Sequence, residues 1–237
     1  YSDAVSLAFL DAYAAGVFVA CSAGNDGPGA NTVGHREPWT TTVAASTTDK
    51  LYYGSAQLTA ASSASLAVEG MSVYDGTLPA APVVLSSAAP YGDDLCLAPA
   101  APGSLAGKIV ACKRGTNARV LKSANVAAGG AVGMILCNTS ATQSLNADIH
   151  AVPSVHIDNV QGAALVAFLT AQTGVSASIT GVRLLTGQGD VTASFSSRGG
   201  AGQALGISKP DVAAPGVDIL AGYSGKLAVP TGPDGQI

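Results

Sequence analysis

A short apolar stretch that runs into a glycine-rich turn limits the fold of this chain more than any other feature. It covers residues 17–29 and reads VFVACSAGNDGPG. Before it, residues 3–15 carry apolar side chains at helical spacing, with Ser2 or Asp3 as an N-cap and Gly16 as a C-cap. A helix, a tight turn and an apolar strand make half of a βαβ unit. We therefore expect an α/β fold in which a parallel sheet is packed with helices.

The character of the sequence changes near residue 50 and changes back near residue 190. The outer parts hold further strand-like runs between Gly- and Pro-rich loops, at residues 39–45, 190–197 and 209–220. The central part predicts antiparallel strands over 51–85, helices at 117–128 and 162–169, and strands at 108–112, 131–137, 153–157 and 175–184. We predict three parts: residues 1–50, an α+β insert with its own core over 51–188, and residues 189–237.

The helix expected at residues 117–128 has a predicted buried side. Its apolar residues recur at helical spacing, which predicts that one face packs on the core of the insert. These residues are Val120, Leu121, Ala124, Ala127 and Ala128.

Composition and charge argue against several classes of partner. The net charge is −4 and only 11% of residues are charged, so there is no basic stripe for a nucleic acid. The longest nearly apolar run, residues 126–137, is too short to span a bilayer, and no membrane partner is expected. The loop GNDGPG lacks the spacing of a phosphate-binding motif. We expect no cofactor, and no calcium site is indicated.

Two histidines raise the question of a metal site. His150 and His156 lie near Asp148 and Asp158 in the sequence. Alternation along a strand would place His156 on one face with Ser154 and Asp158. No third ligand has the spacing typical of a metal site, so we expect none here.

The four cysteines divide into two kinds. Cys96 and Cys112 flank a turn-rich stretch, which predicts a disulfide that closes a hairpin, whereas Cys21 and Cys137 lie within apolar runs and are expected to be buried thiols. With no CxxC motif, neither zinc nor a redox pair is expected. A disulfide favours an oxidising compartment. Asn138 opens an Asn-Thr-Ser glycosylation pattern, a short pattern that also occurs by chance.

Asn25 is the polar side chain that the glycine-rich turn presents. It lies between Gly24 and Gly27, which allow unusual backbone conformations. An amide is neither a nucleophile nor a base, so any catalytic role of Asn25 would serve groups elsewhere. The alternative is an asparagine that simply tolerates positive φ in a turn.

Four motifs of the outer parts occur in a characteristic order. They are SAGN followed by Gly27, PW with VAAS four residues on, SFSSRG at residues 194–199, and KPDVAAPG at residues 209–216. In this order they resemble the subtilisin-like serine proteases. The central part is similar to the protease-associated (PA) domain of cucumisin-like subtilases, through GKIVACKRG at 107–115, AGGAVGMIL at 128–136 and VPSVHI at 152–157.

The resemblance assigns roles to several residues. It implies that Asn25 is the oxyanion-hole donor, that Ser22, Ala23 and Gly24 form one wall of the S1 pocket, and that Val33, Gly34 and His35 form its other side or floor. It implies structural pairing or capping for Arg198 and Asp211. The implied function is that of a secreted serine endopeptidase that hydrolyses polypeptides by a Ser/His/Asp mechanism.

The three motifs that carry the catalytic triad in this family do not occur in the 237 residues. They are D-[ST]-G, H-G-T-H and G-T-S-x-x-x-P, and neither Asp3, His35 nor Ser224 lies in such a context. We therefore expect an internal fragment that is inactive alone. The alternative is a PA-type module of a pseudoprotease that binds substrates or other proteins, with self-association through the PA domain as a further expectation.

Overall fold

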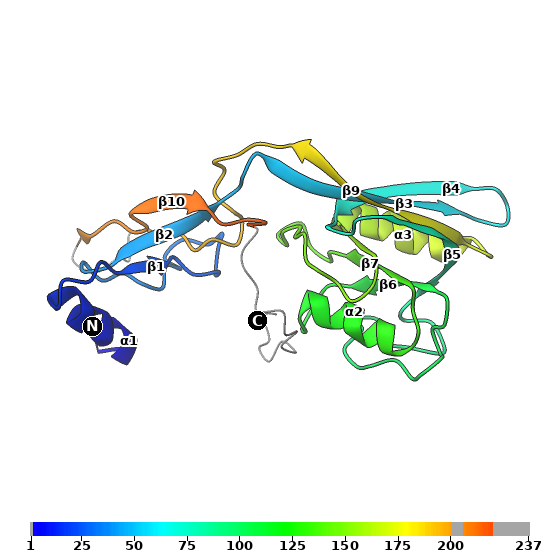
Figure 1. Cartoon of the computed structure of the whole chain (residues 1–237), viewed down its shortest axis with the longest axis horizontal. Helices are drawn as coiled ribbons and strands as arrows, with labels where there is room; N and C mark the ends of the chain where they lie inside the picture. The colour runs from blue at the N-terminus through cyan, green and yellow to red at the C-terminus, as the bar shows by residue number, and fades with distance from the viewer. Residues whose placement is uncertain (1, 201–205, 220–237) are drawn as a thin grey trace. The chain divides into compact units, whose positions relative to one another are not determined.

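The computed structural model describes residues 2–200 and 206–219, and these form two compact units (Figure 1). Among the described residues, one unit contains residues 2–50 together with those from Thr186 to residue 219, and the other contains Leu51–Leu185. The domain boundaries expected from the sequence stay a prediction. Residue 220 and Ser224 lie outside the described residues, as does the Pro-containing stretch 227–233, for which the sequence predicts a loop.

The first unit is a small parallel sheet with one helix. Helix α1 (Ala4–Ala14) begins where the Asp3 carboxylate accepts a hydrogen bond from the Ser6 amide, 2.9 Å away, and Gly16 follows it with φ 83°. Strands β1 (Ala20–Ser22), β2 (Thr41–Ser46) and β10 (Val212–Pro215) are all parallel, in the order β1-β2-β10.

Two strands expected in this unit are absent from its described residues. The stretch 190–197 makes a single bridge, from Thr192 to Ser46, and then turns. It does not extend a ladder, because the Ser196 Oγ, a side-chain atom, accepts from the Ala45 amide of β2, and the Ser197 amide then donates to the Gly24 carbonyl of the glycine-rich turn. After β10 the chain leaves the strand conformation, and Asp218 has φ 52°.

The second unit is a closed barrel of seven strands in the order β3-β4-β8-β7-β6-β5-β9. The strands β5, β6, β7 and β8 are parallel neighbours, while the pairs β3–β4, β4–β8 and β5–β9 are antiparallel. The strand bounds are β3 Lys50–Thr59, β4 Ser65–Met71, β5 Thr77–Leu85, β6 Ile109–Lys113, β7 Gly133–Cys137, β8 Ser154–Ile157 and β9 Ser176–Thr186. Helices α2 (Arg119–Ala128) and α3 (Asn159–Ala171) both contact β7.

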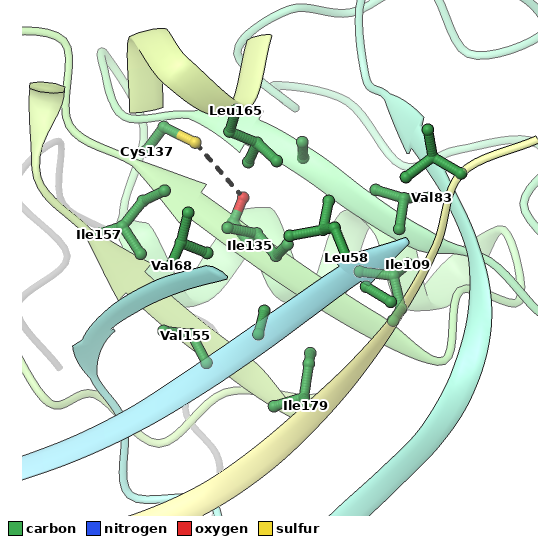
Figure 2. Close-up of a cluster of buried hydrophobic side chains, with 14 of the residues drawn as sticks. Leu58, Val68, Val83, Ile109, Ile135, Cys137, Val155, Ile157, Leu165 and Ile179 are labelled. Atoms are coloured by element: carbon green, nitrogen blue, oxygen red, sulfur yellow. Dashed lines mark hydrogen bonds between the residues drawn. The ribbon is translucent and has the colours of Figure 1, made fainter. Parts of the chain in front are cut away.

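Two hydrophobic clusters lie on opposite faces of the central strands. The first gathers Ile109 of β6, Ile135 of β7 and Leu165 of α3 with side chains of the other barrel strands (Figure 2). The second gathers Val110, Met134 and Val126 of α2. Because successive side chains on β6 and β7 alternate between the clusters, both strands are buried on both faces, which explains their continuous apolar sequence.

The buried side of α2 differs from the expected one. Ala124 and Ala128 are exposed, while Lys122, Ser123, Asn125 and Val126 are buried. Val126 packs in the second hydrophobic cluster, while the polar residues of this face bond to backbone carbonyls: the Lys122 ammonium donates to the Leu95 carbonyl, and Asn125 Nδ2 donates to the Cys96 carbonyl at 2.9 Å. A pattern of apolar positions cannot predict such a face. Lys122 and Asn125 can be buried only because their polar groups find hydrogen-bond partners, and those partners lie elsewhere in the sequence.

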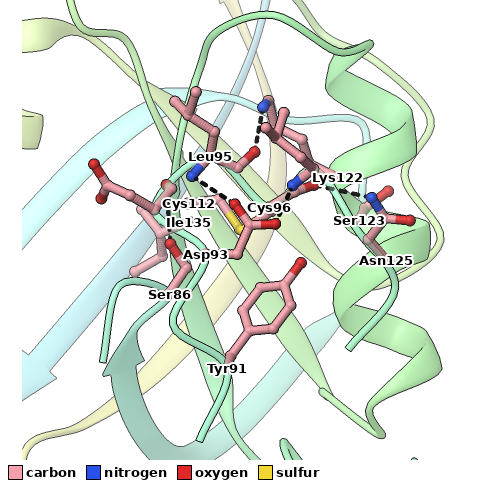
Figure 3. The surroundings of a disulfide bond; sticks show 12 residues. Ser86, Tyr91, Asp93, Leu95, Cys96, Cys112, Lys122, Ser123, Asn125 and Ile135 are labelled. Atoms are coloured by element: carbon pink, nitrogen blue, oxygen red, sulfur yellow. Dashed lines mark hydrogen bonds between the residues drawn. A yellow bond between two sulfur atoms is a disulfide. The ribbon is translucent and has the colours of Figure 1, made fainter. Parts of the chain in front are cut away.

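Cys96 and Cys112 form a disulfide, but it does not close a hairpin (Figure 3). Cys112 lies on β6, and Cys96 lies in an irregular loop with φ 51°. The bond therefore fixes a loop onto a central barrel strand. Cys21 and Cys137 are buried free thiols, as their apolar surroundings predicted.

Candidate functional site

The glycine-rich turn lies at the carboxyl end of β1, an edge strand of the parallel sheet. The Ala23 amide still donates to the Val43 carbonyl at 2.8 Å, and Gly24 then enters the left-handed region with φ 101°. Asn25 follows, exposed, and its side chain makes no hydrogen bond with any other described residue. Its amide N–H groups are therefore available to a ligand.

The two segments predicted as walls of one pocket lie next to each other. The Gly34 amide donates to the Ala23 carbonyl at 3.0 Å, so residues 22–24 and 33–34 are directly bonded. Ala23 and Val33 are each only 1% exposed, whereas Ser22 and Gly34 are exposed. Small residues thus present backbone rather than bulky side chains at Ser22 and Gly34.

The side chain of His35 packs against helix α1. Its ring packs edge-on against Phe9 with 5.5 Å between the ring centroids, and its Nδ1 lies 3.9 Å from the Glu37 carboxylate. The His35 carbonyl accepts from Thr42 Oγ1 at 2.7 Å. A role for His35 in the pocket stays a prediction, and its ring already has a packing partner.

Ser197 and Arg198 bond to the two sides of this site, which the sequence alone does not predict. Ser197 bonds to the turn around Asn25, since its amide donates to Gly24 O at 2.9 Å and its Oγ accepts from the Asp26 amide at 3.0 Å. The Arg198 carbonyl accepts from the amides of Thr32 and Val33 at 2.9 and 3.2 Å. The sequence signal for this contact is the serine pair of the SFSSRG motif, for which the sequence alone predicts no role.

The two charged residues of the family motifs do not pair with each other. Asp211 accepts from Lys209 Nζ at 2.6 Å and from the Thr42 amide at 2.7 Å, and Arg198 donates to the Ala193 carbonyl at 3.2 Å. Burial alone would raise the pKa of Asp211, but these hydrogen bonds outweigh it and hold the pKa below its usual value. All three hydrogen bonds join residues of the first unit to one another and have structural roles.

His156 of the barrel unit is buried, and both of its ring nitrogens have hydrogen-bond partners within the fold. His156 Nε2 lies 2.7 Å from Asn138 Oδ1, and its Nδ1 lies 3.2 Å from the Asn146 amide. The expected shared face with Asp158 is wrong, because β8 ends at Ile157 and Asp158 caps α3 by accepting from the Gln161 amide.

Asp148, the other carboxylate near the histidines, forms an ion pair with Arg119 at 2.5 Å. Among residues 2–200 and 206–219, no three His, Cys, Asp or Glu side chains gather as metal ligands.

Acidification is expected to destabilise the barrel unit. Burial lowers the pKa of His156 to about 3 and that of His150 to about 4, so neither takes up a proton in the folded unit near neutral pH. In the unfolded chain both would titrate near 6.5. The unfolded state therefore binds more protons below that value, and the free energy of unfolding falls as pH drops from about 7.5 to about 5.5.

Urea unfolding of the chain at the two pH values would measure this slope. His156→Gln removes one of the two titrations and should flatten the slope, even if it lowers stability at both pH values. A free energy of unfolding that rises on acidification, or a slope unchanged in the variant, would contradict the prediction.

The glycosylation pattern at Asn138 is expected to be unused in the folded protein. Asn138 is 4% exposed; its Nδ2 donates to the carbonyls of Gln143 and Ser144, and its Oδ1 accepts from Arg114 and His156. A glycan on Nδ2 would break this network and place a bulky polar group in a buried site. Mass spectrometry of the peptide that contains Asn138, from secreted folded protein, should show an unmodified asparagine; a hexosamine adduct would contradict this.

Comparison with known proteins finds similar sequences for both units of the chain. A protein-family model described as "PA domain" matches residues 79–165. "Subtilisin-like protease SBT1.7" of Arabidopsis thaliana is 38% identical over 98% of this chain, and "Subtilisin-like protease SBT1.3" of the same plant is 37% identical over 95%. The chain belongs to the subtilisin-like protease family and carries a PA domain. The expected fold class, a subtilisin-like parallel sheet with an α+β PA insert, is confirmed.

This subtilase chain spans 31% of the length of the first of these relatives and 30% of the second. Among solved structures, it is similar to the subtilisin-like protease Apa1 of Pseudoalteromonas sp. AS-11, with 18% identity, a TM-score of 0.35, and coverage of 83% of this chain and 55% of that one. An aminopeptidase from Aneurinibacillus sp. strain AM-1 gives 23% identity, a TM-score of 0.39 and coverage of 58% and 34%. No helix among the described residues is long and apolar enough to cross a membrane.

Proposed function

We propose that this chain is part of a secreted serine endopeptidase, to which it contributes the oxyanion-hole donor Asn25 and part of the S1 pocket. The observation that carries the proposal is the state of Asn25: exposed, free of hydrogen bonds to other described residues, and placed at the end of β1. Beside it, residues 22–24 and 33–35 would receive the side chain on the acyl side of the scissile bond.

The chemistry follows from the charge that develops during amide hydrolysis. When a serine attacks the carbonyl carbon of a peptide bond, the carbonyl oxygen becomes a tetrahedral oxyanion. An amide N–H already aimed at that position favours the transition state over the bound substrate, because its hydrogen bond strengthens as the charge grows. Asn25 takes no proton and forms no covalent bond in this scheme, and the reaction uses no cofactor.

Secretion and a polypeptide substrate complete the proposal. The buried Cys96–Cys112 disulfide is typical of proteins that mature in an oxidising compartment. The relatives are named as proteases, which supports peptide bonds as the substrate class. The nucleophile, base and orienting acid would come from sequence outside these 237 residues, since the motifs that hold them are missing here.

Labelling with a serine-directed fluorophosphonate tests the proposal. The full-length protein that contains this chain should be labelled at one serine and should hydrolyse peptides, whereas the 237-residue chain alone should remain unlabelled. Heat-inactivated full-length protein serves as the control for nonspecific reaction. Labelling of a serine within this chain would contradict the proposal. Full-length protein that neither reacts nor hydrolyses peptides would favour the alternative, a PA-type binding module of a pseudoprotease.

A further inference from the structure

Ser197 holds the backbone on both sides of Asn25. Its amide donates to the Gly24 carbonyl at 2.9 Å, and its Oγ accepts from the Asp26 amide at 3.0 Å. The residues before and after Asn25 are therefore bonded to one and the same residue. Two such bonds fix the peptide planes that flank Asn25, and with them the direction in which its side chain leaves the chain.

The contact between Ser197 and the turn leaves no spare room. Ser197 is completely buried, and a Cβ added at Gly24 would lie 2.8 Å from Ser197 Oγ. Gly24 also has φ 101°, a conformation that residues with side chains rarely adopt. The turn thus rests directly on the Ser197 hydroxyl, and Asn25 itself remains without a hydrogen bond of its own side chain to another described residue.

We infer that Ser197 is a positioning residue for catalysis: it holds the Asn25 amide in the direction that an oxyanion requires. This rests on the proposed function of Asn25. A donor lowers the barrier only if it needs no reorientation at the moment of reaction, and the side chain of Asn25 has no other anchor among the described residues. Ser197 touches neither substrate nor the reacting atoms, so its effect reaches the reaction through Asn25 alone.

The neighbouring residue Ser196 provides a matched control. It is 1% exposed, and its Oγ accepts a backbone hydrogen bond of the same length, 3.0 Å, from the Ala45 amide in β2. Replacement of either serine by alanine removes one buried hydroxyl and leaves one backbone amide, that of Asp26 or that of Ala45, without that acceptor. The two variants should therefore lose similar stability, but only Ser197→Ala removes a hydrogen bond to the turn that carries Asn25, leaving the backbone bond to Gly24 as the remaining one.

Steady-state kinetics of the full-length protease test the inference. Ser197→Ala is expected to lower kcat by about 10- to 100-fold with KM changed less than about threefold, since a misplacement of about 1 Å can cost about 10²-fold in rate. Ser196→Ala should keep kcat within about threefold of the parent. The affinity of a peptide aldehyde, which forms the tetrahedral adduct, should fall with kcat in the Ser197 variant.

The double variant Asn25→Ala/Ser197→Ala separates positioning from general weakening. If Ser197 acts only through Asn25, the double variant should have the same kcat as Asn25→Ala alone. Multiplied losses, or equal losses in the Ser196 and Ser197 variants, would overturn the inference. If Asn25→Ala itself leaves kcat unchanged, the proposed function fails instead. Should Ser197→Ala not fold, Ser197→Cys keeps the shape with a weaker acceptor and must still lower kcat more than Ser196→Ala.

Discussion

Replacement of Asn25, the proposed oxyanion donor, by alanine is expected to lower kcat of peptide hydrolysis by the full-length protein by about 10²–10³-fold and to leave KM nearly unchanged; the figure was measured on a subtilisin, a member of this family, and is carried over from it. The loss falls on kcat because the hydrogen bond to the oxyanion strengthens only as the tetrahedral intermediate forms. Steady-state kinetics on a peptide substrate would measure both constants.

Two further measurements make this result specific to the amide. The Asn25 side chain is exposed and makes no hydrogen bond with the other described residues, so Asn25→Ala should leave the melting temperature unchanged. Asn25→Asp keeps the shape but replaces the N–H donor with a negative charge, which repels an oxyanion. Its kcat should therefore be at least as low as that of the alanine variant. A kcat within about threefold of the parent in Asn25→Ala would contradict the role.

Removal of the Cys96–Cys112 disulfide should lower the free energy of unfolding of the barrel unit by about 3 kcal/mol, the value that a chain-entropy model gives for a loop of about 15 residues. The two cysteines are separated by 16 positions, and both are completely buried. The bond fixes the loop whose Cys96 carbonyl accepts from Asn117 and Asn125, so its loss also loosens the contact with α2 (Figure 3).

Urea unfolding of the chain with and without dithiothreitol would measure the loss. The variant Cys96→Ala/Cys112→Ala should unfold at lower urea concentration and should no longer respond to the reductant. The remaining thiols, Cys21 and Cys137, are buried, and burial raises the pKa of Cys137 to about 12, so they should not react in the folded state. An unchanged unfolding midpoint in the reduced chain would contradict a stabilising disulfide.

The sequence predicted best those elements whose local pattern agrees with their burial. The continuous apolar runs of β6 and β7 predicted strands because both faces of these strands are buried. The helix α1 was predicted from its caps and spacing. The turn that carries Asn25 was predicted from glycines and a motif, and the Gly34 amide bonds to the Ala23 carbonyl, while the pocket expected from residues 22–24 and 33–35 stays a prediction.

Features set by partners distant in sequence could not be predicted from local pattern. The stretch 190–197 alternates like a strand, but its groups bond to the turn at 24–27 and, through Ser196, to β2. The face of α2 is buried through Lys122 and Asn125, polar residues that a hydrophobic pattern assigns to solvent. The role of Ser197 was missed for the same reason: its two bonds reach Gly24 and Asp26, and the latter spans 171 positions of sequence.

The pairing of β10 with β2 has a consequence for the order in which this chain folds. Val212 pairs with Val43, so this contact forms only after the intervening barrel has been synthesised. A flexible loop of that length would make closure slow and entropically unfavourable. The two connections to the barrel, however, lie side by side: the Gly187 amide donates to the Asp49 carbonyl at 2.7 Å, and Thr47 Oγ1 donates to the Gln188 carbonyl at 2.7 Å. A barrel that folds first brings these ends together, so the parallel sheet below Asn25 is completed as though a short turn, rather than a whole domain, separated its strands.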